Sequence, residues 1–124
     1  MRGTVLLLAG EDLGAVYTEH LRANGLLVYE AAHPEDADLI APDVVVTVWS
    51  RDGSPSVIRE LRNRLDQATS IIVVSTATSR EDRRAAHEAG ADSVLRMPAP
   101  AGEVLYEVQR ALILRRSGRR LPRP

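Results

Sequence analysis

Apolar and polar positions divide the chain into alternating strand-like and helix-like segments. Short runs rich in β-branched residues predict five strands, over residues 4–9, 26–31, 43–48, 70–76 and 92–96. These runs are largely continuous and do not alternate apolar with polar positions. They therefore predict strands that are buried on both faces, as in a parallel sheet.

Helical periodicity fills the gaps between the strands. Three apolar stripes mark it: Leu13, Val16, Tyr17, His20 and Leu21; Val57, Ile58, Leu61 and Leu65; and Val104, Leu105, Val108 and Leu112. A further helix is predicted between Ser79 and Gly90 from the signals at its two ends. The helix ends carry the expected signals: Asn24-Gly25 as a stop, Ser54-Pro55 as a start, and a capping box from Ser79 to Asp82. Residues 34–40 suffice for two helical turns at most. Repeated strand–helix units with right-handed crossovers predict an α/β fold, a doubly wound five-stranded parallel sheet with helices on both faces.

Length and composition predict one domain and its setting. The chain has 124 residues, of which 44% are hydrophobic and 27% charged, as in ordinary globular proteins. We expect one domain over residues 1–114, followed by an Arg-rich tail or linker over residues 115–124. No apolar run approaches the roughly 20 residues needed to cross a bilayer, and no signal peptide is evident, so we expect a cytoplasmic protein without a membrane span.

The sequence contains neither cysteine nor lysine, and these two absences exclude some kinds of chemistry. Without cysteine there is no disulfide, no thiol nucleophile and no Cys-ligated metal, and without lysine there is no Schiff base. Charge is unevenly distributed: residues 110–124 carry six arginines and no acid, so residues 1–109 carry ten arginines against 17 acids. The basic end has no interleaved aromatic residues or recognition motif, and we expect no nucleic-acid binding.

Four stretches resemble one protein family over nearly the whole chain. They are Val5-Leu6-Leu7-Leu8, Pro42-Asp43-Val44-Val45-Val46, Ile71-Ile72-Val73-Val74-Ser75, and "AGADSVLRMP" from Ala89 to Pro98. Together they resemble the receiver domain of two-component response regulators, which implies a CheY-like, flavodoxin-like fold. In that family, an aspartate at the end of strand three accepts a phosphoryl group. Acids after strand one help to bind Mg²⁺, a Ser or Thr follows strand four, and a lysine precedes the strand-five proline.

The sequence departs from the family at most of these positions. The acceptor position falls on Val48, or on Thr47 with a shift of one residue, and the lysine position falls on Met97. The acid pair falls on Ala9 and Gly10, with Glu11 and Asp12 following directly, and only Ser75 matches. The resemblance therefore implies a degenerate receiver, or pseudoreceiver: not an enzyme, with a vestigial phosphorylation pocket, acting in phosphorelay signalling through protein contacts.

Other interpretations of this end of the sheet stay open. Glu11 and Asp12 supply hard oxygen ligands for a weak Mg²⁺ site, whereas the simpler interpretation is that they cap the first helix; we expect no other cofactor. With Mg²⁺ there, an unexpected acceptor such as Asp52 would make the chain an aspartyl-phosphorylated switch. A flavodoxin-like domain that binds a small ligand is a third possibility. Thr47 would need a neighbouring base to act as a nucleophile, and the sequence offers none nearby. A structural role for Thr47 is therefore favoured.

Contacts with other proteins are expected on the last strand and the last helix. Tyr106 and Ile113 lie off the apolar stripe of the last helix, and Val94 occupies the place of a switch aromatic in receivers. We expect them to form a homodimer interface or to bind another signalling protein. Trp49, the only tryptophan, either anchors a partner or packs over the sheet end. His20, His33 and His87 lack metal-ligand spacing.

Overall fold

A computed structural model gives the fold of the chain and describes residues 3–9, 14–49 and 55–122. Five parallel strands form one sheet in the order β2-β1-β3-β4-β5. The strands are β1 (Thr4–Ala9), β2 (Leu27–Ala31), β3 (Val44–Trp49), β4 (Ser70–Ser75) and β5 (Ser93–Arg96). The helices are α1 (Ala15–Ala23), the 3₁₀ turn η1 (Pro34–Asp36), α2 (Ala37–Ile40), α3 (Pro55–Arg64), α4 (Arg80–Ala89) and α5 (Ala101–Arg115). The predicted fold class is confirmed, with strand ends that differ from the prediction by one residue.

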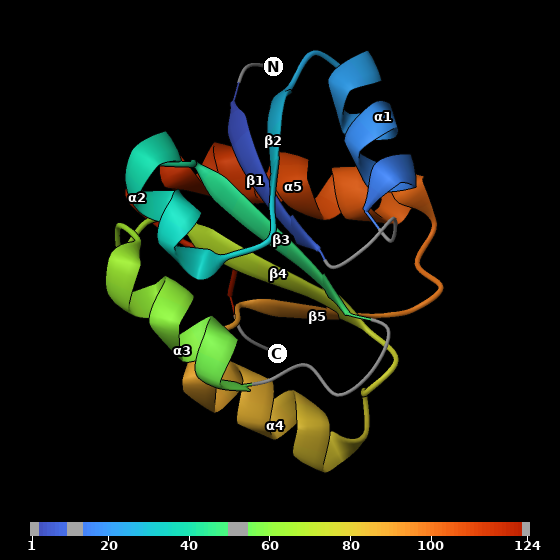
Figure 1. The fold of residues 1–124 in the computed structure, drawn as a ribbon, viewed down its shortest axis with the longest axis vertical. Coiled ribbons are helices and arrows are strands. Elements are labelled where there is room, and N and C mark those ends of the chain that lie inside the picture. Colours follow the sequence, from blue (N-terminus) through green and yellow to red (C-terminus); the bar gives the residue numbers. More distant parts are fainter. Residues whose placement is uncertain (1–2, 10–13, 50–54, 123–124) are drawn as a thin grey trace.

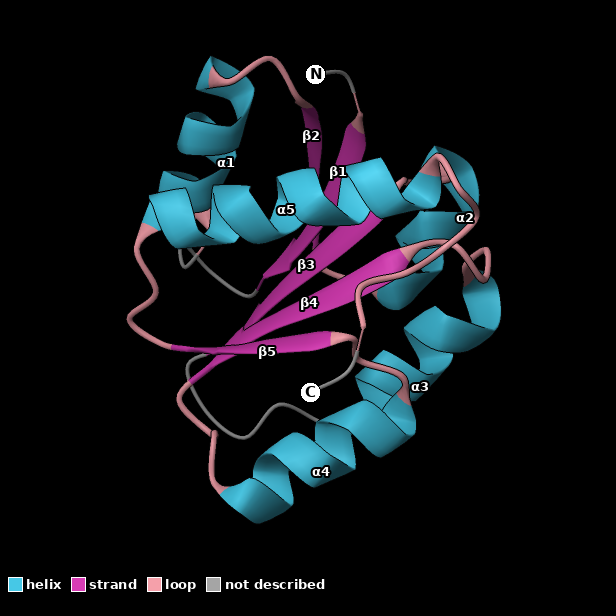
Figure 2. Cartoon of the chain, turned by 180° about the vertical axis from the view of Figure 1, so that it is seen from behind, coloured by secondary structure: helices cyan, strands magenta, loops and turns pink. Residues whose placement is uncertain are grey.

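The helices cover the sheet in two layers, so the core has two halves. Helices α1 and α5 lie on one face, and α2, α3 and α4 lie on the other (Figures 1 and 2). Alternation along β3 directs Val44, Val46 and Val48 to the α1–α5 half and Val45 to the other. All four of these valines have no exposed surface. The continuous apolar runs therefore reflect a sheet that is buried on both faces.

Local signals set the ends of α4 as the sequence predicts. The Ser79 hydroxyl accepts a hydrogen bond from the Asp82 backbone N–H, and the Asp82 carboxylate accepts one from the Ser79 N–H, at 3.1 and 3.2 Å. Gly90 ends the helix with φ at 125°, a conformation that favours glycine. A Cβ atom there would also meet the Arg62 side chain at 2.9 Å.

The C-terminal segment corrects one prediction. Residues 115–122, expected to form a tail or linker, pack against the amino-terminal end of the sheet. Arg115 Nε lies 2.9 Å from Asp43 Oδ1, and Arg120 Nε lies 3.1 Å from Asp92 Oδ1. The Leu121 side chain is only 3% exposed, and its backbone N–H donates to Ser70 Oγ. Up to Pro122, the predicted tail therefore belongs to the packed body. None of the helices in the described part of the chain is both long and apolar enough to cross a bilayer.

Candidate functional site

Three of the predicted site residues, Thr47, Val48 and Ser75, lie near the carboxyl-terminal edge of the sheet. In the strand register, Ala9 lies opposite Val48, Val48 opposite Val74, and Trp49 opposite Ser75. In open parallel sheets this edge is where ligands bind. Thr47, Val48 and Ser75 thus lie where a ligand of such a sheet would bind, and their role there stays a prediction. Glu11, Asp12 and Asp52 lie outside the described residues.

Val48 occupies the central position of this edge and is inaccessible. Its side chain has no exposed surface and belongs to the same apolar cluster as Val74, Ala99 and Val104. Ala9 and Met97, both partly buried, pack against that cluster. The positions that the resemblance assigns to the acceptor, one acid and the lysine thus hold hydrocarbon and thioether groups in one packed region. These side chains provide no nucleophile and no charge.

Thr47 is poorly placed to act as an acceptor. It is fully buried and points to the opposite face of the sheet from Val48, toward the half of the core between the sheet and α2–α4. Its hydroxyl has no hydrogen-bond partner among the described residues. A buried hydroxyl without a neighbouring base is a poor nucleophile. The geometry therefore agrees with a structural role.

Ser75 and Tyr17 organise the loops around this edge. Ser75 is 2% exposed, and its Oγ accepts a hydrogen bond from the Ala77 backbone N–H at 3.0 Å. The Tyr17 hydroxyl donates to the Ala99 carbonyl at 2.8 Å, which ties α1 to the loop after Met97. Burial raises the pKa of Tyr17 above 10.0; the hydrogen bond to Ala99 opposes this shift, and Glu103 adds to it. Tyr17 therefore stays a neutral donor at physiological pH.

The described residues offer no metal centre. Among residues 3–9, 14–49 and 55–122, no three His, Cys, Asp or Glu side chains come together as metal ligands would. His87 Nδ1 lies 2.9 Å from the Ala91 carbonyl, a contact at the end of its own helix. The proposed ligands Glu11 and Asp12 lie outside the described part, so a weak Mg²⁺ site there stays a prediction.

Comparison with solved structures identifies the architecture. A CheY-like receiver domain from Methanospirillum hungatei superimposes with a TM-score of 0.83 at 15% identity, over 95% of this chain and 99% of that one. A response regulator from Thermotoga maritima superimposes with a TM-score of 0.76 at 18% sequence identity, over 91% of this chain and 99% of that one. Chemotaxis protein CheY4 from Vibrio cholerae superimposes with a TM-score of 0.77 at 21% sequence identity, over 90% of this chain and 100% of that one. No protein-family model and no curated protein matches the sequence.

The chain has the CheY-like receiver fold. Sequence identities of 15 to 21% establish the fold alone. The topology agrees with this, because the strand order β2-β1-β3-β4-β5 is the flavodoxin-like order. Within the receiver fold, the site edge is the carboxyl end of β1, β3 and β4, where Ala9, Val48 and Ser75 stand.

The predicted contact residues divide into two groups in this receiver fold. Tyr106 and Ile113 are 61% and 53% exposed on α5, with the Arg110 guanidinium 5.8 Å from the centre of the Tyr106 ring. Val94 is only 8% exposed, so its assignment to a surface interface is wrong. The pleat of β5 turns Val94 inward between the sheet and α4. Trp49 is half-buried and lines a pocket.

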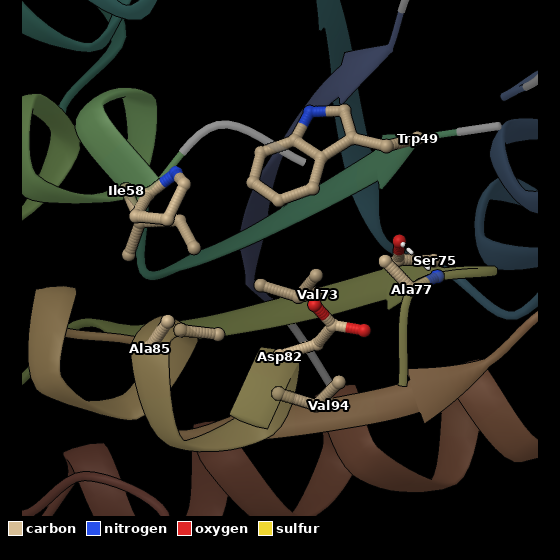
Figure 3. A pocket seen from close by; sticks show the side chains of 10 residues that line it. Trp49, Ile58, Val73, Ser75, Ala77, Asp82, Ala85 and Val94 are labelled. Carbon is tan, nitrogen blue, oxygen red and sulfur yellow. Dashed lines mark hydrogen bonds between the residues drawn. The ribbon is translucent and has the colours of Figure 1, made fainter. Parts of the chain in front are cut away.

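That pocket is the feature which sequence analysis missed. It lies between α3 and α4 over the ends of β3 and β4, with Trp49 on one side and Asp82 and Val94 on the other (Figure 3). Its volume is about 220 Å³. The only signal in the sequence is the pair of small residues Ala85 and Ala86 on the inner side of α4. Two alanines leave a pocket only where α3 and α4 lie far enough apart, and the sequence does not give that distance.

Proposed function

We propose that this chain is a receiver-like domain of two-component signalling that works without phosphorylation, through contacts with other proteins. The observation that carries the proposal is Val48, which stands at the acceptor position with no exposed surface inside an apolar cluster. The receiver fold supports the signalling class, since three structures of similar fold are named as receivers, response regulators or chemotaxis proteins.

The chemistry of phosphoryl transfer supports the loss of phosphorylation. The transferred group carries charge on its equatorial oxygens, which cations must neutralise. Met97 offers a thioether in place of an ammonium group, and Ala9 offers no metal ligand. Val48 has no oxygen on which an acyl phosphate can form. We infer that the chain is not an enzyme and that its function needs no bound cofactor.

The partner that we propose is a protein in the cytoplasm, either a second copy of this chain or another signalling protein. Tyr106 and Ile113 give α5 an exposed apolar strip on the side away from its buried residues Val104 and Val108. An aromatic ring and a branched aliphatic side chain on such a strip are suited to contact with a partner. Val94 is not part of this surface.

Incubation with acetyl phosphate and Mg²⁺, followed by intact-protein mass spectrometry, tests the proposal. We expect no added phosphoryl group, whereas an acid-stable, base-labile adduct would overturn it. Mapping the adduct then separates Asp52 from other acceptors, and Asp52→Asn serves as the matched variant. In parallel, Trp49 fluorescence is followed during addition of Mg²⁺ with beryllofluoride. We expect a flat response, because the acceptor position has no carboxylate; a saturable change would favour the aspartyl-phosphorylated switch.

A further inference from the structure

The pocket beside Trp49 is separate from the position of Val48. Its walls come from β3, α3, β4, the turn after β4, α4 and β5, and they include Trp49, Ile58, Ser75, Asp82, Ala85 and Val94. Val48 belongs to the other half of the core, beneath α1 and α5. The pocket therefore lies on the opposite face of the sheet from Val48, although Trp49 and Ser75 belong both to its lining and to the edge described above.

Small side chains create the space. Ala85 and Ala86 form the wall on α4, Ala77 lies in the turn after β4, and Val94 lies on β5 (Figure 3). The indole of Trp49 lies across the pocket from Val94. The volume of this partly open pocket, about 220 Å³, exceeds the ~150 Å³ apolar cavity that suffices for benzene in an engineered protein. One ring, or two fused rings, fits this volume.

The walls determine the chemistry of a ligand. Ile58, Val73 and Val94 present aliphatic groups, and Trp49 presents an aromatic surface. The Asp82 carboxylate at the rim already accepts hydrogen bonds from the Ser79 hydroxyl and N–H, at 2.7 and 3.2 Å. The Ser75 hydroxyl already accepts one from Ala77. An anion would lie near Asp82 without a cation among the lining residues, so the pocket disfavours negative charge.

We propose that this pocket binds a small, uncharged aromatic molecule of one or two rings. The ring contacts the indole of Trp49, in the offset or edge-to-face arrangement that aromatic pairs prefer. The aliphatic walls exclude water from its other face. This inference goes beyond the proposed function, and it stands or fails independently because its test involves no phosphorylation.

Fluorine NMR of fluorobenzene and fluoroindole, titrated with the full chain, tests the proposal. We expect saturable binding of both probes and matching shifts in the indole N–H signal of Trp49 in proton–nitrogen spectra. Fluorobenzoate, an anion of the same ring, should neither bind nor compete, whereas toluene should compete better than cyclohexane. Failure of both probes to bind, or equal competition by fluorobenzoate, would overturn the proposal.

Substitutions locate the binding. Ala85→Leu fills the pocket from α4, and we expect affinity to fall by at least about tenfold with the fold retained. Ala23→Leu, the same change at an exposed position at the end of α1, should leave affinity unchanged. Trp49→Leu keeps an apolar wall without the ring, so the preference for toluene over cyclohexane should disappear. Binding that Ala85→Leu does not weaken would place the ligand elsewhere and refute the proposal.

Discussion

At the scale of single residues, the orientation of two neighbours on β3 determines the chemistry of the site edge. Val48 and Thr47 are adjacent, yet the pleat sends them to opposite halves of the core. The only hydroxyl of β3 is therefore directed away from the acceptor position. It is also left without a hydrogen-bond partner among the described residues.

We predict that Thr47→Val raises the free energy of unfolding by about 1 kcal/mol. Burying a hydroxyl without a partner costs roughly 1–3 kcal/mol, and valine has nearly the same shape. Urea unfolding followed by Trp49 fluorescence measures the change.

Thr69→Val is the matched control for that substitution. The Thr69 hydroxyl is equally buried, but it donates to the Pro42 carbonyl and accepts from Arg115 Nη1, both at 3.3 Å. Its loss should lower the free energy of unfolding by about 1–2 kcal/mol, the opposite sign. A destabilised Thr47→Val variant would show that the hydroxyl has a role in the fold.

At the scale of elements, the sequence predicts most of the fold because local signals and burial agree. Continuous β-branched runs require a sheet covered on both faces, and Ser79, Asp82 and Gly90 define one helix almost alone. Val16 falls on the apolar stripe that the sequence predicts for the first helix, but it is 66% exposed. The helical period alone did not show where the core face of α1 ends. Val94 was misplaced because its direction depends on the pleat of β5.

The C-terminal segment shows why other contacts escape prediction. Leu121 is a single apolar residue among arginines, so no periodicity marks it. Its burial depends on Ser70 and on the ion pairs of Arg115 and Arg120, which join residues far apart in sequence. The sequence does not predict the pocket beside Trp49 either, because its walls come from five elements and a turn that lie far apart in the sequence. Val48 and Met97, in contrast, indicate from the sequence alone that two of the positions assigned by the resemblance carry no charge.

We predict that Leu121→Ala lowers the free energy of unfolding by about 2–4 kcal/mol. Removing a buried leucine side chain costs this much when the surrounding groups cannot close the space. Leu39→Ala is the matched control, because Leu39 is 88% exposed on α2, and its loss should change stability by less than about 0.5 kcal/mol. Urea unfolding provides both values. Equal effects of the two substitutions would mean that the C-terminal segment does not dock.

At the scale of the whole molecule, the fold brings its basic end against its acidic body. Arg115 contacts Asp43 and Asp66, and Arg120 contacts Asp92, which is also paired with Arg62. Asp92 is 1% exposed, and it accepts a hydrogen bond from the Ile71 N–H. Arg115 and Arg120 are therefore engaged within the protein. The Arg-rich composition of residues 110–124 thus overstates the positive charge available to a polyanion.

We predict that the chain does not bind duplex DNA at low or moderate salt. Phosphate binding requires several cations that are free to release counterions, and the acidic body repels the DNA backbone. Fluorescence anisotropy of a labelled duplex measures this, with Asp43→Asn/Asp66→Asn as the comparison, because that variant frees Arg115 and removes two acids. If this variant binds weakly at low salt and the wild type does not, the internal ion pairs account for the difference. Salt-sensitive binding by the wild type would instead assign the basic end a nucleic-acid partner, against the proposal of a protein-contact module.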